Sequence, residues 1–220
     1  MEEAVEIEVG AVTLEARLAA PSAPTGGVAL CHPHPLHGGD MDNPVVVRAA
    51  EVCRDAGLAT LRFNFRGVGA SGGTHGGGEG ERQDILGALA LLEKALGPTA
   101  PLGVIGYSFG AWVGGRVACS HDRVSGVALI APPLAFYDFG FLGACRKTVL
   151  LVAGSRDPYS PREEFQALAA GIPGAQTRVI EGADHFLFGK LYPLGEAVAV
   201  WAHGFSETSP GKARRGGGAG

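Results

Sequence analysis

The chain has 220 residues, and its 36 glycines, 14 prolines and 46% hydrophobic residues, set in short apolar runs, predict a folded chain rather than a low-complexity one. Its net charge of −4 comes without a basic stripe, which argues against nucleic acid or an anionic membrane surface as a partner. No apolar run is long enough to cross a bilayer and the acidic N-terminus is unlike a signal peptide, so we expect a cytoplasmic protein without a membrane partner.

The first predicted elements are two segments, residues 5–9 and 12–18, in which apolar and polar residues alternate. This alternation about a Gly-Ala turn predicts an antiparallel hairpin at the edge of a sheet. The following strands are short and nearly all apolar, which is typical of a parallel sheet buried on both faces. They are residues 28–31, 59–65, 102–105, 124–131 and 149–153, and residues 177–181 are interpreted as the last strand.

Segments with helical periodicity lie between these strands, at residues 45–56, 83–96, 110–120, 161–170 and 192–205. The alternation of strand and helix predicts an α/β fold with helices on both faces of a mostly parallel sheet and ligands at the carboxyl ends of its strands. No repeat or internal linker interrupts the pattern, so residues 1–208 are interpreted as one domain. Residues 209–220 are rich in glycine and lack an apolar anchor, which predicts a disordered tail.

The four cysteines, Cys31, Cys53, Cys119 and Cys145, stand in apolar surroundings without CxxC spacing. Thiols of this kind are usually small hydrophobic core residues. The sequence therefore predicts four reduced core cysteines, as in a cytosolic protein.

The segment Gly106-Tyr107-Ser108-Phe109-Gly110 carries the strongest chemical signal. It stands between a predicted strand and a predicted helix, so its serine must occupy a sharp and strained turn. The residues two positions before and after the serine must be small, because the backbone passes close to itself there. This context predicts a nucleophile elbow with Ser108 exposed at a helix N-terminus, rather than an ordinary glycine turn.

A serine nucleophile needs a base, and the base needs an orienting carboxylate. Asp157 and His185 each follow a predicted strand, so both are expected at the sheet edge where Ser108 lies. The order Ser108, Asp157, His185 is the one expected for a catalytic triad on such a sheet. The alternative interpretations are a helix cap for Asp157 and a surface loop histidine for His185, and Asp138 is a weaker rival acid.

Two further motifs extend this pattern: CHPHPLHGG over residues 31–39 and NFRGVGASG over residues 64–72. Together with the elbow and the triad, they make the chain resemble the α/β-hydrolase superfamily over about residues 5–206. The resemblance is to the branch of small, capless, dienelactone-hydrolase-like serine esterases, and it implies an α/β-hydrolase fold. Only residues 132–147 separate the strands between which larger members insert a helical cap, so no cap domain is expected.

An oxyanion hole needs preorganised N–H donors. One is expected from the backbone of Phe109, the residue after the nucleophile. The other should come from the loop after the third strand, where Pro33 and Pro35 have no N–H to give, which leaves His34 and Leu36. The resemblance favours His34, although Pro33 stands where the superfamily usually has glycine.

The remaining polar residues of these loops are given structural interpretations. His32, His34 and His37 lack the partners that a metal site needs, so no metal is expected. His75 is interpreted as a solvated loop residue, and Arg66 as a residue that holds its loop rather than one that binds substrate.

These motifs predict a serine hydrolase that cleaves small or short-acyl carboxylic esters through an acyl-enzyme intermediate, with no cofactor and a small-molecule ester as its partner. The alternatives are a thioesterase or amidase with the same triad and, from a different class, a catalytically idle binding module on this fold. The sequence carries no signal for an oligomeric state. The candidate substrate-binding residues are apolar or aromatic: Leu36, Tyr107, Phe136, Tyr137, Tyr159 and Phe186.

Overall fold

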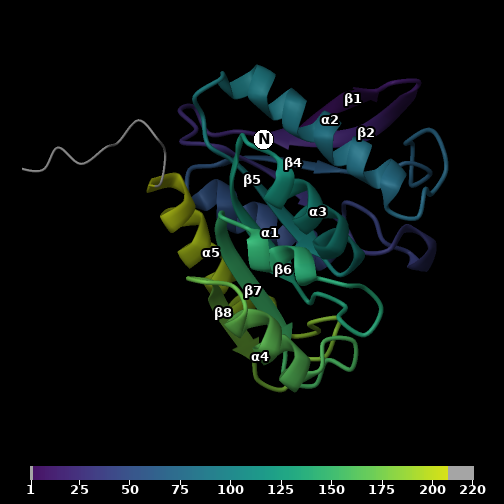
Figure 1. Ribbon diagram of the computed structural model, residues 1–220. Coiled ribbons are helices and arrows are strands. Elements are labelled where there is room, and N and C mark those ends of the chain that lie inside the picture. Colours follow the sequence, from purple (N-terminus) through teal and green to yellow (C-terminus); the bar gives the residue numbers. More distant parts are fainter. Residues whose placement is uncertain (1, 208–220) are drawn as a thin grey trace, which may run out of the picture.

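The alternating segments at the N-terminus form the predicted antiparallel hairpin. The computed structural model describes residues 2–207 (Figure 1), and in it β1 (Glu3–Val9) pairs with β2 (Val12–Ala19) at one edge of the sheet. Alternate side chains such as Ile7 and Leu14 are buried, while Glu6 and Glu8 are exposed. The tail predicted over residues 209–220 and the domain boundary at 208 lie outside the described residues.

The remaining strands form the parallel part of one eight-stranded sheet, in the order β1-β2-β4-β3-β5-β6-β7-β8. They are β3 (Gly27–Cys31), β4 (Ala59–Phe63), β5 (Leu102–Tyr107), β6 (Val124–Ile130), β7 (Thr148–Gly154) and β8 (Gln176–Ile180). β2 joins β4 antiparallel, and every pairing from β4 to β8 is parallel. The predicted mostly parallel sheet is therefore confirmed, and its nearly all-apolar strands are buried on both faces.

Helices cover both faces of the sheet, as predicted (Figure 1). On one face, α2 (Glu79–Leu96), α3 (Phe109–Ser120) and α4 (Arg162–Ala170) contribute to one hydrophobic core. On the other face, α1 (Pro44–Asp55) and α5 (Leu191–Glu207) enclose a second core that contains Trp201 and Phe205. Within residues 2–207, no helix combines the length and the hydrophobicity needed to cross a membrane.

The connection between β6 and β7 leaves the carboxyl ends of the strands uncovered. It holds one short 3-10 helix, η2 (Gly140–Ala144), in place of the helical cap found in larger members of this fold class. Within residues 2–207, this connection therefore holds no cap domain, as predicted.

The prediction of four reduced cysteines was wrong for two of them. Cys119, near the end of α3, forms a disulfide with Cys145, which directly follows η2, and the two Cα atoms are 5.0 Å apart. That separation lies in the range that a disulfide spans. Cys31 and Cys53 are free and buried, as predicted.

Candidate active site

Ser108 stands at a tight turn between β5 and α3. Its φ of 55° and ψ of −118° are backbone angles that residues other than glycine rarely adopt. A Cβ on Gly106 would overlap the carbonyl group of Gly110, and one on Gly110 would lie 2.6 Å from the carbonyl oxygen of His32. The N–H of Ser108 donates to the carbonyl of Ile130 on β6, at 2.9 Å. Local sterics and this bond together hold the serine in the conformation expected of an elbow.

His185 lies in the loop after β8 and reaches across to Ser108. Its Nε2 is 2.9 Å from Oγ of Ser108, and its Nδ1 is 2.8 Å from Oδ2 of Asp157. The imidazole is nearly buried, and the hydroxyl of Tyr107 donates to the backbone carbonyl of His185 at 3.0 Å. The structure therefore brings together the three side chains that the sequence singled out.

Asp157 follows β7, and its side chain is fully buried. While Oδ2 contacts His185, Oδ1 accepts the N–H groups of Tyr159 at 2.8 Å and Ser160 at 3.2 Å. Asp157 thus holds the turn that follows it and contacts the histidine. It is not a helix cap, because the N-cap of α4 is Pro161 and makes no side-chain cap bond. The rival Asp138 is engaged elsewhere, because its Oδ1 accepts the N–H of Gly140.

The loop after β3 approaches the N-terminus of α3, and the rings of His34 and Phe109 lie 4.8 Å apart. The N–H of Leu36 donates to Nδ1 of His34 at 3.2 Å, so it is already used within the short helix η1 (Pro35–His37). Within residues 2–207, the backbone N–H groups of Phe109 and His34 donate to no protein acceptor. Within the described residues, both N–H groups are therefore free to bind an acceptor on a ligand.

His32 fixes the start of this loop. It is fully buried, its Nδ1 lies 2.6 Å from the carbonyl oxygen of Pro33, and its Nε2 accepts the N–H of Phe65 at 3.0 Å. Burial lowers the pKa of His32 to about 4, so the ring is neutral near pH 7, with its proton on Nδ1. In the described residues, no group of three His, Cys, Asp or Glu side chains could hold a metal ion.

The interpretation of His75 as a solvated residue was wrong. Its side chain is 17% exposed, and its Nδ1 lies 2.8 Å from Oε1 of the buried Glu81. The reason is that the ring of His75 packs against the rings of His34 and Phe109, although most of the glycine-rich segment around it is exposed. Arg66 holds that loop, as predicted, through an ion pair of 2.6 Å with the buried Asp84.

Exposed aromatic side chains flank His185. The ring of Tyr159 lies 4.8 Å from the imidazole and that of Phe186 lies 5.8 Å from it, and Phe136 stands 5.1 Å beyond Tyr159. Phe186 is 55% exposed and Phe136 is 64% exposed. Three of the candidate substrate-binding residues thus lie near His185, and their side chains are exposed.

The other three candidates lie in different settings. Leu36 is largely exposed on the loop after β3. Tyr137 is half-buried, and its ring is stacked on that of Trp112 with 4.4 Å between the ring centroids. Tyr107 is buried beneath the site and supports His185 from below, so the structure does not place it on the open face. The sequence did not reveal the burial of Tyr107. Its position in a predicted strand does not show that the side chain before the elbow serine turns into the core.

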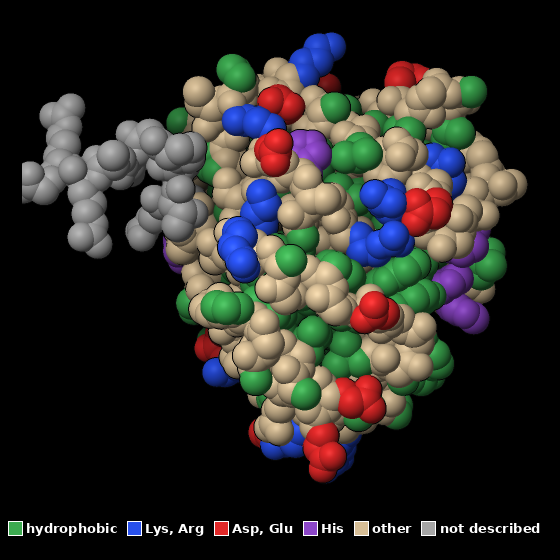
Figure 2. All heavy atoms as spheres, in the orientation of Figure 1, with side chains coloured by type: hydrophobic (Ala, Val, Ile, Leu, Met, Phe, Trp, Pro, Cys, Tyr) green, Lys and Arg blue, Asp and Glu red, His purple; other side chains and the backbone are tan. Residues whose placement is uncertain are grey.

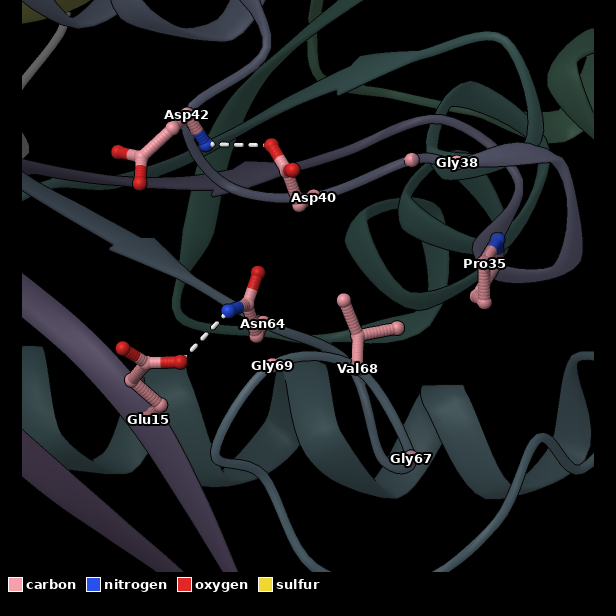
Figure 3. A pocket seen from close by; sticks show the side chains of 10 residues that line it. Glu15, Pro35, Gly38, Asp40, Asp42, Asn64, Gly67, Val68 and Gly69 are labelled. Atoms are coloured by element: carbon pink, nitrogen blue, oxygen red, sulfur yellow. Dashed lines mark hydrogen bonds between the residues drawn. The ribbon is translucent and has the colours of Figure 1, made fainter.

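A cavity of about 460 Å³ opens beside the loop after β3, and Ser108, Asp157 and His185 do not line it (Figure 3). Its walls come from β2 and from the loops after β3 and β4, and Figure 3 shows Asp40 and Asp42 on one side of the opening and Glu15 and Asn64 on the other. The lining residues are Glu15, Pro35, Gly38, Gly39, Asp40, Asp42, Asn64, Gly67, Val68 and Gly69.

The space-filling view shows mixed charges on the face of Figure 1 and a group of histidine side chains at its right-hand edge, next to hydrophobic surface (Figure 2). No broad basic stripe is visible on this face. Histidine side chains therefore gather at this edge more than elsewhere on the face shown.

Comparison with known proteins places the chain among related sequences. A family model described as an alpha/beta hydrolase domain matches residues 36–191. An uncharacterized protein of Rickettsia prowazekii (strain Madrid E) is 34% identical over 196 residues, which cover 84% of this chain and 82% of that protein.

Two solved structures share both sequence and fold with this chain. An alpha-beta serine hydrolase homologue from Coxiella burnetii is 34% identical, with a TM-score of 0.82, and the match covers 90% of this chain and 96% of that one. A serine hydrolase without lid from Xanthomonas campestris is 27% identical, with a TM-score of 0.84 and coverage of 95% and 97%.

Proposed function

Because the chain belongs to the alpha/beta hydrolase family, we propose that it is a serine hydrolase that cleaves carboxylic esters with small or short acyl groups and needs no cofactor. One observation carries the proposal: a single imidazole, that of His185, lies within hydrogen-bond distance of both Ser108 and Asp157. This arrangement allows a histidine to activate a serine hydroxyl while a carboxylate fixes its orientation.

The proposed reaction has two steps. In the first, Oγ of Ser108 forms a bond to the ester carbonyl carbon while its proton passes to Nε2 of His185. The imidazolium then gives this proton to the leaving alcohol as the ester C–O bond breaks, and the carboxylate of Asp157 stabilises the positive charge. In the second step, His185 takes a proton from water while the water oxygen bonds to the acyl carbon. It then gives this proton to Oγ of Ser108 as the bond from Oγ to the acyl carbon breaks, which releases the acid and restores Ser108.

The oxyanion of each tetrahedral intermediate is proposed to bind the backbone N–H groups of Phe109 and His34. Both are free of protein acceptors within residues 2–207, whereas the N–H of Leu36 is used by His34. The N-terminus of α3 adds its partial positive charge at the same place. Removal of one such donor costs about 3 kcal/mol in the barrier in a well-studied protease, so these groups are central to the proposal.

The preference for small or short acyl groups is supported by the open surroundings of Ser108. No cap covers the site, and the cavity beside the oxyanion loop does not include the triad. The apolar contacts available to a substrate are then the exposed rings of Tyr159, Phe186 and Phe136 and the side chain of Leu36. Contacts of this kind are shallow, and they add little binding energy for a long acyl chain.

The decisive test is Ser108→Ala, assayed with p-nitrophenyl acetate. We expect hydrolysis to fall to the background rate, because the nucleophile is removed while the fold is kept. The matched control is Ser120→Ala, at the opposite end of the same helix, where the side chain only bonds to carbonyls of its own helix. Turnover in Ser108→Ala equal to that of the wild type would refute the proposal.

Thioester or amide cleavage would use the same residues, so acyl-CoA thioesters and p-nitroanilides belong in the same panel as p-nitrophenyl esters of increasing acyl length. A catalytically idle binding module is distinguished by a fluorophosphonate probe. We expect an adduct on Ser108 of the folded wild type, and its absence would favour the binding module.

A further inference from the structure

A second pair of a carboxylate and an imidazole lies beside the site, and the proposed triad does not use it. Glu81, in the first turn of α2, is fully buried, with its Oε1 2.8 Å from Nδ1 of His75. The same carboxylate accepts the N–H groups of Gly76 at 2.8 Å and Gly78 at 2.7 Å. The two N–H bonds fix the position of the buried carboxylate, and the ring of His75 lies in contact with it.

Glu81 is ionised in this setting. Burial works to raise the pKa of its carboxyl, but the N–H donors of Gly76 and Gly78 and the nearby His75 outweigh burial and hold the pKa below its usual value. The buried carboxylate of Glu81 therefore stays charged beside the ring of His75. Its negative charge also acts on the other histidines of the site.

The ring of His75 contacts both residues whose N–H groups are proposed to bind the oxyanion. Its centroid lies 4.9 Å from that of His34 and 5.5 Å from that of Phe109. We infer that Glu81 and His75 are positioning residues: Glu81 holds His75, and the ring of His75 packs against His34 and Phe109, keeps them in place and opposes a charge on His34. This inference rests on the proposed function, because it assigns the pair to the oxyanion site of that reaction.

The neutral form of His34 matters because its Nδ1 accepts the N–H of Leu36. A proton on that nitrogen would face another N–H, open the turn of η1 and displace the backbone of His34. Burial lowers the pKa of His34, and the neighbouring His75 and His37 lower it further, while Glu81 acts in the opposite direction. The position of the His75 ring against His34 therefore opposes a charge on His34.

The other titratable groups that face His34, His75 and Glu81 come from separate elements. None of them takes the role of His75 beside His34. His32, at the end of β3, stays neutral because burial lowers its pKa to about 4. Arg66 is committed to Asp84 of α2 at 2.6 Å. His37, on η1, is the remaining neighbour, with its ring 4.7 Å from that of His34.

The first test uses kinetics at pH 8 and asks whether the ring of His75 is needed to hold the proposed oxyanion site. His75→Ala removes the ring, and we expect kcat for p-nitrophenyl acetate to fall at least tenfold with KM within twofold, because oxyanion contacts act mainly in the transition state. His75→Phe restores a ring of similar size, and we expect kcat within threefold of the wild type. A kcat within twofold of the wild type in His75→Ala would overturn the inference.

The second test follows the titration of His34 by NMR of its Cε1–H, assigned with a His34→Gln variant. In His75→Phe, Glu81 still raises the pKa of His34, but the contribution of His75 that lowers this pKa is gone. We therefore expect the midpoint of the His34 titration to rise by at least half a pH unit. An unchanged or lower midpoint would overturn the inference, even if His75→Ala failed to fold.

The matched control is Glu79→Gln, which removes a carboxylate from the same turn of α2. Glu79 is exposed and pairs with Arg82 and Arg116, so we expect kcat and the His34 midpoint to stay unchanged. A shift as large as that in His75→Phe would overturn the inference, because a distant charge would then suffice. The NMR arm needs no turnover: an inactive wild type refutes the proposed function, and an unshifted midpoint refutes the positioning role.

Discussion

Replacement of Gly110 by alanine should destabilise the fold and misplace the nucleophile together. Gly110 is the second residue of α3, and a Cβ there would lie 2.6 Å from the carbonyl oxygen of His32 and 2.8 Å from the carbonyl carbon of Cys31. Both are backbone atoms, which cannot rotate away as the end of a side chain would. The helix must then move away from β3, and Ser108 and Phe109 at its N-terminus must move with it.

Two opposing contributions set the size of this effect. Alanine is favoured over glycine inside a helix by about 1 kcal/mol. Overpacking costs about 1–3 kcal/mol, and overlap with rigid backbone belongs at the upper end of that range. The net loss of stability is thus about 2 kcal/mol, or roughly 4–8 °C in Tm for a chain of this size. Because a misplacement of about 1 Å can cost 10²-fold in rate, we expect kcat to fall at least tenfold.

The assay combines urea unfolding, followed by circular dichroism, with hydrolysis of p-nitrophenyl acetate. The matched control is Gly204→Ala in α5, where an added Cβ would meet no heavy atom within 4 Å. That variant should gain about 1 kcal/mol of stability and keep its kcat. Wild-type stability in Gly110→Ala would refute the close backbone approach, and an unchanged kcat in a destabilised Gly110→Ala would refute the coupling of α3 to the site.

Three further changes test separate parts of the site. Asp157→Asn should lower kcat about 10⁴-fold with the circular dichroism spectrum unchanged, and a loss below tenfold would contradict an orienting role. Tyr107→Phe removes the hydrogen bond to the carbonyl of His185 and should lower the free energy of unfolding in urea by about 1 kcal/mol. Because burial lowers the pKa of His32 from 6.5 to about 4, the unfolded chain binds more protons between these values. Stability should therefore fall by about 1.4 kcal/mol per pH unit as the pH drops through this window, and urea titrations of His32→Gln should lack that contribution.

Hydrophobic periodicity predicted the order and type of the elements, and the errors at their ends have physical causes. The strand predicted over residues 59–65 ends at Phe63, because Phe65 turns out of the sheet and donates its N–H to His32. The helix predicted from residue 83 begins at Glu79, because its first turn is polar and is held by the reach of Glu81 back to the N–H of Gly78. Apolar spacing carries no information about a turn stabilised in this way.

The triad could be proposed from sequence because parallel strands deliver the loops at their carboxyl ends to one edge of the sheet. The pairing of Cys119 with Cys145 could not, because it depends on how η2 packs against the end of α3. The pair of His75 and Glu81 was also missed, since its histidine sits in a glycine-rich segment that looks solvated. A signal was present in the glutamate placed at the start of a helix, where it can accept backbone N–H groups.

The end of β5 shows how one strand supports both halves of the site. Tyr107 turns into the core shared with α1 and α5 and anchors the loop of His185, while Phe109, two residues later, enters the core shared with α2 and α3. Ser108 stands between them at the strained turn. Changes at Tyr107 should therefore act on the base and changes at Phe109 on the oxyanion site, so the Ser108–His185 contact depends on the packing of both cores.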